Sequence, residues 1–200
     1  MKQLAHISLL LLSVAVAQAQ GTYEAVMDFS NSPSSGIITG TAGWSFTPQI
    51  TIQLTHLGCL DYVVTPQGPV DIGIWTDAGV LLSQAVVYAT NSPVNQTRYV
   101  GVTPILLAAG STYRIGAYSP SGSLFLDPVG PGYGGAVTLS SDIVLGGLAV
   151  GAPGFVFPNQ SGAAGTMILA PNFRYDRIPE PGTVGLLAVA GLLLAARKRK

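Results

Sequence analysis

The fold is decided by the segment Val70-Asp71-Ile72-Gly73-Ile74-Trp75-Thr76-Asp77-Ala78-Gly79, which residues 80–88 follow. Val70, Ile72 and Ile74 alternate with Asp71, Gly73 and Trp75, and a period of two is typical of a strand with one buried face. Thr76 to Gly79 has the composition of a turn, because Asp77 can bond its local backbone and Gly79 tolerates a positive φ. The segment therefore predicts a β-hairpin.

The same alternation continues on both sides of this hairpin. Residues 49–57 and 111–118 each place apolar side chains at every second position, and we expect them to be strands. The expected core consists of Ile50, Ile52, Leu54, Val70, Ile72, Ile74, Tyr113 and Ile115. Further strands are expected at residues 23–29, 97–102 (closed by Pro104), 123–126, 155–157 and 167–173. Residues 137–139 and 143–150 are short apolar runs of ambiguous structure, and the second fits either a strand or a helical turn.

Outside the two termini, the sequence shows no convincing amphipathic helix. Regularly spaced short strands separated by turn residues predict an all-β fold, an antiparallel β-sandwich of jelly-roll type. We expect one domain over residues 20–173 and a linker over residues 174–181, which contains Pro179-Glu180-Pro181.

The N-terminus has the layout of a secretory signal peptide over residues 1–19. Lys2 and His6 precede an apolar segment at residues 7–16, and Ala17-Gln18-Ala19 forms a cleavage site of A-x-A type. The apolar segment is too short to span a bilayer as an anchor. We therefore expect cleavage after Ala19 and export of the mature chain.

The C-terminus has three parts in a fixed order. The rigid Pro179-Glu180-Pro181 comes first, an uncharged apolar run over residues 182–196 follows, and the cations Arg197, Lys198, Arg199 and Lys200 come last. The run spans about 22 Å as a helix, short for a hydrocarbon core of about 30 Å, so we expect a transmembrane helix with local thinning of the bilayer. The basic cluster predicts that the end stays in the cytoplasm. A plain tail anchor and an apolar helix packed on the domain are the alternatives.

This tripartite tail, with Thr183 and a Gly/Leu/Ala-rich run, resembles the PEP-CTERM sorting signal of Gram-negative bacteria. Gly182 departs from that pattern, in which Ser or Ala is commoner. The resemblance covers about the last 23 residues. It implies that a membrane enzyme, exosortase, processes the chain, which is first held in the inner membrane with its domain outside the cytoplasm and then reaches the cell surface or the medium.

A second resemblance covers residues 43–118. It is carried by Gly43-Trp44-x-Phe46, by Leu57-Gly58, by Gly73-Ile74-Trp75-x-Asp77-x-Gly79-x-Leu81 and by Leu107-x-Ala109-Gly110-x-x-Tyr113-x-Ile115-Gly116. These motifs look like those of a β-sandwich family of unknown function in bacterial surface proteins. Asn172-Phe173 is also similar to the way many exosortase substrates finish their last strand.

Charge and cysteine content exclude several classes of function. Residues 20–178 contain eight acidic and four basic side chains, a net charge of −4, and no lysine. An acidic domain of this kind is a poor nucleic-acid binder. Cys59 is the single cysteine, so the chain cannot form an internal disulfide, and stability must come from the core.

The sequence contains few residues in patterns that are typical of an active site, and we expect that the protein is not an enzyme. His56 and Cys59 are three residues apart on a strand and should point to opposite faces unless a bulge intervenes. No serine lies in a G-x-S-x-G elbow, and too few His and Cys residues are present for a zinc site. Asp61, Asp71 and Asp77 are the alternative, as a glycosidase pair or as calcium ligands, although they also suit strand edges and turns.

The aromatic residues Trp44, Trp75, Tyr118 and Tyr133 are the better candidates for a binding surface. They suit a sugar-stacking platform, and the two tryptophans suit the core equally well. Two functions follow as expectations. One is a non-enzymatic envelope or matrix protein among exopolysaccharides, and the other is a carbohydrate-binding module at the same location.

Overall fold

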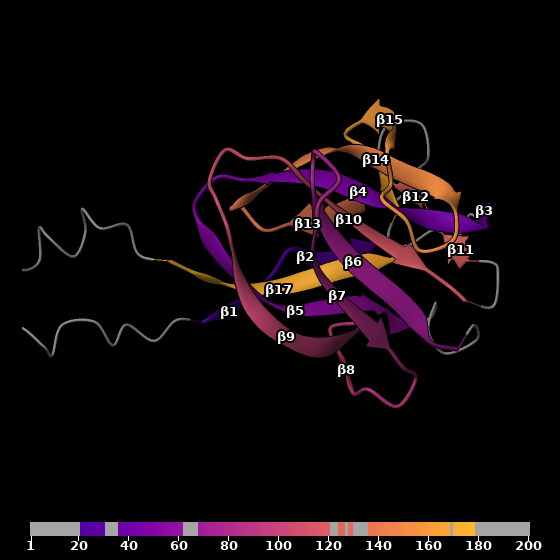
Figure 1. Ribbon diagram of the computed structural model, residues 1–200. Coiled ribbons are helices and arrows are strands. Elements are labelled where there is room, and N and C mark those ends of the chain that lie inside the picture. The colour runs from indigo at the N-terminus through magenta and orange to yellow at the C-terminus, as the bar shows by residue number, and fades with distance from the viewer. Residues whose placement is uncertain are drawn as a thin grey trace, which may run out of the picture.

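In the computed structural model of the protein, residues 21–30, 36–61, 68–120, 124–126, 128–129, 136–168 and 170–178 are described. These residues form almost entirely antiparallel β-strands arranged in a sandwich-like fold (Figure 1). The expected all-β class is confirmed.

Two larger sheets make up the body of the molecule. The first has five strands in the order β1 (Thr22–Glu24), β17 (Pro171–Arg177), β5 (Ile52–Leu60), β9 (Thr97–Leu107) and β8 (Pro93–Val94). The second has six strands in the order β15 (Gln160–Ala164), β14 (Ile143–Pro153), β4 (Gly40–Pro48), β10 (Tyr113–Tyr118), β6 (Val70–Thr76) and β7 (Leu81–Val87).

Three short antiparallel pairs accompany these sheets. They are β11 (Leu124–Leu126) with β3 (Gly36–Ile38), β12 (Pro128–Val129) with β16 (Met167–Ile168), and β13 (Ala136–Leu139) with β2 (Val26–Ser30).

The core lies between the two larger sheets. The Phe173 ring of β17 lies 4.7 Å from the Phe46 ring and 6.0 Å from the Trp44 ring, both on β4. The indole N–H of Trp44 donates a hydrogen bond to the carbonyl of Pro171 at 3.0 Å, so its polar atom is satisfied inside the core. Of the eight expected core residues, seven are buried, and Ile50 is partly buried against the cluster because it precedes the first residue of β5.

The hairpin of β6 and β7 forms as predicted. Val70, Ile72 and Ile74 are fully buried, and Gly79 closes the turn with a φ of 87°. The turn is fastened by Thr76, whose carbonyl accepts from the Gly79 N–H at 3.0 Å and whose hydroxyl accepts from the Val80 N–H at 3.1 Å. Asp77 bonds to Arg114 instead of to its local backbone.

A bulge in β5 explains its apolar pattern. Ile52 and Leu54 are buried before Thr55, and Leu57 and Cys59 are buried after it, so the buried phase shifts by one residue. Leu60, at the end of the strand, is buried as well. The register against both neighbouring strands shifts at the same place. One residue of β5 there faces three of β9, and this irregularity accommodates Pro104 within β9, since proline cannot donate to a regular ladder. The expectation that Pro104 ends this strand was wrong.

Three other expectations also need correction. Residues 155–157 are not a strand, because Gly154 adopts a φ of 107° and leads the chain off β14. Residues 174–177 belong to β17 rather than to a linker, because Tyr175 continues the buried alternation of Phe173. Residues 40–48, which were expected only to lead into the next strand, form β4 between β14 and β10.

Residues 143–150, left open between strand and helical turn, belong to β14. The described residues contain no helix that is long and apolar enough to cross a membrane. The expected signal cleavage site (Ala17 and Ala19), sorting motif (Pro179, Glu180 and Pro181), apolar run 182–196 and basic cluster (Arg197 to Lys200) lie outside the described residues.

Candidate functional site

On the outer face of the six-stranded sheet, two glycines lie side by side on neighbouring strands. Gly73 of β6 lies directly opposite Gly116 of β10, so neither strand places a side chain there. The Trp75 indole and the Phe155 ring fill this space and tilt against each other, with ring centroids 5.4 Å apart. A Cβ added at Gly73 would lie 2.3 Å from Trp75 Cη2 and 2.7 Å from Phe155 Cζ, so this close approach requires glycine.

Phe155 belongs to a strap, residues 154–159, that crosses this outer face. Thr41 holds the start of the strap, because its hydroxyl donates to the Gly154 carbonyl at 2.8 Å and accepts from the Val156 N–H at 2.9 Å. Arg114 holds the other end through a hydrogen bond to the Pro158 carbonyl at 2.7 Å. The strap is therefore fixed at both ends against the sheet.

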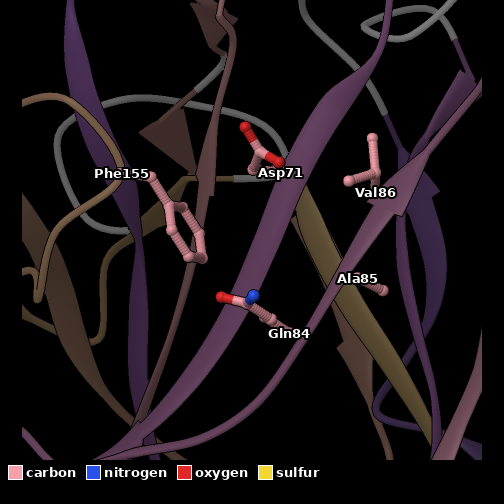
Figure 2. Close-up of a pocket in the computed structure, with 5 residues that line it drawn as sticks. All are labelled: Asp71, Gln84, Ala85, Val86 and Phe155. Carbon is pink, nitrogen blue, oxygen red and sulfur yellow. The ribbon is translucent and has the colours of Figure 1, made fainter.

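Beside the strap lies a hollow of about 280 Å³. Its lining consists of Asp71, Gln84, Ala85, Val86 and Phe155 (Figure 2). Figure 2 shows Asp71, Gln84 and the Phe155 ring around one space, with the carboxylate higher and the carboxamide lower than the ring in this view, both on its right. The hollow thus combines an acceptor, a donor-acceptor amide and an aromatic surface.

The carboxylate of Asp71 has no ion pair or hydrogen bond within the described part of the chain. Burial raises the pKa of this half-buried carboxyl above its usual value. Val86 and Tyr118 lie directly opposite Asp71 on the two neighbouring strands, so their side chains share its face of the sheet.

The four aromatic residues expected to form a sugar-stacking platform are not brought together. Trp44 is fully buried between the sheets, so the structure favours the core alternative for it. Trp75 lies on the outer face but is only 4% exposed, because Phe155 covers it. Tyr118 is half-buried beside Asp71, and Tyr133 lies outside the described residues.

His56 and Cys59 form no dyad. Cys59 is buried in the core, and burial raises the pKa of its thiol, so it is not a nucleophile at neutral pH. The imidazole of His56 is on the other face, with Nδ1 3.0 Å from the hydroxyl of Thr55. Burial, and then the charge of Arg174, lower the pKa of His56, while Asp176 opposes them.

The three aspartates that were candidate calcium ligands or catalytic acids lie apart. Asp61 pairs with Arg98 at 2.5 Å, Asp77 pairs with Arg114 at 2.9 Å, and Asp71 lines the hollow. Among the described residues, no three His, Cys, Asp or Glu side chains gather closely enough to hold a metal ion.

A second cluster lies where the described chain ends, and we call Tyr23, Asp142, Tyr175 and Arg177 the C-terminal clasp. Arg177 binds both carboxylate oxygens of Asp142, from Nε to Oδ2 at 2.7 Å and from Nη2 to Oδ1 at 3.1 Å. The Tyr175 hydroxyl donates to Oδ2 at 2.8 Å, and the Arg177 guanidinium stacks 4.2 Å from the centroid of the Tyr23 ring. The hydrogen bonds with Asp142 raise the pKa of Arg177 above its usual value.

The clasp fixes the end of β17 to Tyr23 of β1 and to Asp142, the residue before β14. Just beyond Arg177, the Ile178 N–H donates to the Thr51 carbonyl at 3.2 Å. Three residues earlier on β17, Arg174 forms an ion pair with Glu24 of β1 at 2.9 Å, and Glu24 is buried. β17 is therefore held by charge-assisted contacts up to its final residue.

Sequence reasoning missed Gln84 and Phe155 in the hollow and Asp142 in the clasp. Gln84 and Phe155 are far apart in the sequence, so no local pattern joins them. Pro153-Gly154 and Pro158 do flank Phe155, and these breakers were a signal against the expected strand.

The fold and these two clusters define a small, all-β, sandwich-like domain with a hollow on an outer face and a fastened C-terminal strand. No protein-family profile matches the chain, and no curated protein matches it in sequence.

Proposed function

We propose that this chain is an exported, non-enzymatic protein of the cell envelope or extracellular matrix, held in the inner membrane by its C-terminal run and processed by exosortase at Pro179-Glu180-Pro181. The observation that carries the proposal is the course of β17. Its buried alternation and the C-terminal clasp hold the chain up to Arg177, two residues before the motif. A protease in the bilayer would therefore meet the motif next to a rigid body.

The position of the two chain ends supports this arrangement. Thr22 of β1 lies opposite Asp176 of β17, so the first and last strands of the domain start and finish at the same end of the sandwich (Figure 1). Cleavage after Ala19 would leave the new N-terminus at this end. Residues 178–181 can span about 13 Å when extended, so the same end would face the bilayer.

The proposed anchor consists of a helix over residues 182–196 that ends in the cytoplasmic cations Arg197 to Lys200, and the proposed leader is residues 1–19. We further propose a jelly-roll-type arrangement of the domain. It is supported by the way β4, β5 and β6 alternate between the two larger sheets.

Glu180 is the feature of the motif that an enzyme can select. It is the only charged side chain between Arg177 and Arg197, and the prolines on both sides keep the backbone extended. A cationic or donor-lined pocket would bind its carboxylate by charge-assisted hydrogen bonds.

The experiment compares the parent protein, Glu180→Ala and the control Asp28→Ala in cells with an active exosortase. The measured quantity is the fraction of protein that stays uncut in the membrane. Glu180→Ala should be exported and accumulate there, whereas Asp28→Ala, which changes an exposed carboxylate on β2, should be processed like the parent. Replacing residues 197–200 by serine should instead weaken retention before cutting. If Glu180→Ala is trimmed as fast as the parent, the tail is only an anchor.

A further inference from the structure

The hollow beside the strap lies at the end of the sandwich opposite the two termini. Asp71 is near the start of β6 and Tyr118 is the last residue of β10, whereas Thr76 and Tyr113, at the other ends of these strands, lie near Pro48. Pro48 is at the end that carries the clasp, because the Gln49 N–H bonds to the carbonyl of Asp142. The hollow is thus remote from the point where the described chain ends.

The polar groups of the hollow can form hydrogen bonds with the hydroxyl groups of a ligand. The carboxylate of Asp71 accepts hydrogen bonds, and the exposed carboxamide of Gln84 both donates and accepts. Gln84 lies opposite Gly73 on the neighbouring strand, and the edge of the Trp75 indole and the Phe155 ring lie over that glycine. Neighbouring hydroxyls on one ligand can use both groups at once.

The aromatic ring supplies the other half of the surface. Phe155 is partly exposed, and its orientation is fixed because it rests on Gly73 and tilts against Trp75. A ring held in this way offers an apolar face to carbon-bound hydrogens without a loss of side-chain entropy on binding.

The charges around the hollow select against other ligands. No Lys, Arg or His is among its lining residues, so an anionic ligand would meet only the Asp71 carboxylate. A single carboxylate does not supply enough ligands to hold a metal ion. A volume of about 280 Å³ is at the small end of ligand sites, which suits one ring of a polymer rather than a large ligand.

We propose that the hollow formed by Asp71, Gln84 and Phe155 binds a neutral hexose unit of a polysaccharide. The Phe155 ring stacks on the apolar face of the sugar, and Asp71 and Gln84 bind its hydroxyls. This goes beyond anchoring and processing and does not depend on them, since the site is complete in the uncut chain.

The test is saturation-transfer NMR with the full chain in micelles of a polyoxyethylene detergent, because a maltoside detergent would itself offer a sugar. The probes are the methyl glycosides of glucose, galactose and mannose, with glucuronic acid as the charged comparison. At least one neutral glycoside should bind, and glucuronic acid should bind at least about tenfold more weakly because of repulsion by Asp71.

Two variants locate the binding. Asp71→Ala and Gln84→Ala should each weaken it by about tenfold, the change expected for the loss of one good hydrogen bond to a ligand. Asp28→Ala is the matched control and should bind within about twofold of the parent. Gln84 is exposed, so its variant tests the site without a risk to folding.

Two results would overturn the proposal: no binding of any neutral glycoside, or binding that both hollow variants retain at the parent affinity. Neither result would bear on exosortase processing, which is measured in cells.

Discussion

Removing Arg177 and removing Asp142 from their ion pair should lower the free energy of unfolding by different amounts, because the two side chains are buried to different extents. The side chain of Asp142 is 10% exposed, whereas that of Arg177 is 44% exposed. A charge left alone near the surface is solvated by water, but a carboxylate left alone in a buried position is not.

Arg177→Met keeps the apolar stem and removes the charge. The Asp142 carboxylate then retains the Tyr175 hydroxyl but loses both bonds from the guanidinium, and we expect a loss of about 3–5 kcal/mol in the free energy of unfolding. This includes about 0.5–1 kcal/mol for the cation–π contact with Tyr23.

Asp142→Asn keeps the shape and removes the charge from the other side. The guanidinium left behind can turn into solvent, so we expect a smaller loss, about 1–2 kcal/mol. The control is Asp77→Asn, which breaks an ion pair whose carboxylate side chain is 55% exposed and should cost no more than about 1 kcal/mol.

The assay is urea unfolding of the full chain in detergent micelles, followed by circular dichroism at constant pH. The order of the losses should be Arg177→Met, then Asp142→Asn, then Asp77→Asn. If Arg177→Met costs no more than Asp142→Asn, the carboxylate is not buried and the clasp does not hold β17 in the way described.

Three further predictions concern the body of the domain. Gly43→Ala should lower the free energy of unfolding by about 3 kcal/mol, because the new Cβ would lie 2.1 Å from the backbone oxygen of Ile115. Gly101→Ala is the control and should be nearly neutral, because the nearest atom to its Cβ would be 3.9 Å away. Thermal unfolding of the two variants makes the comparison. Ile72→Asp should cost about 3–5 kcal/mol because the carboxylate has no partner in the core, and an unchanged melting temperature would mean that the strand faces are reversed. The pKa of His56 is lowered in the folded state, so the unfolded state binds more protons as the pH falls below about 6.5 and stability should decrease there. His56→Gln should remove that part of the pH dependence, and an unchanged slope in urea titrations would contradict it.

The hairpin and most of the core could be predicted because they depend on local alternation. Val70, Ile72 and Ile74 are one uninterrupted period-2 set, and a single turn fixes their register. The bulge in β5 was also encoded, since the apolar positions shift phase between Leu54 and Leu57, but a phase shift does not say which residue is extra.

The hollow and the clasp could not be predicted because they join residues that are distant in sequence. Phe155 reaches the hollow only through the strap, and it covers Trp75, which would otherwise be exposed. The polar and charged composition of residues 174–177 predicts a linker, and the structure places them in β17 instead. The two arginines among them, Arg174 and Arg177, are in fact paired with buried acids on β1 and before β14, and this pairing is visible only in three dimensions.

The most direct test of the central claim is the intact mass of the protein recovered outside the cell. β17 is folded up to Arg177, and the motif just beyond it is the proposed point of processing. We therefore predict a chain that begins at Gln20, contains Arg177 and ends within residues 178–182, and that is formed only when exosortase is active. A released chain that still carries residues 183–200, or one cut inside β17, would contradict this prediction.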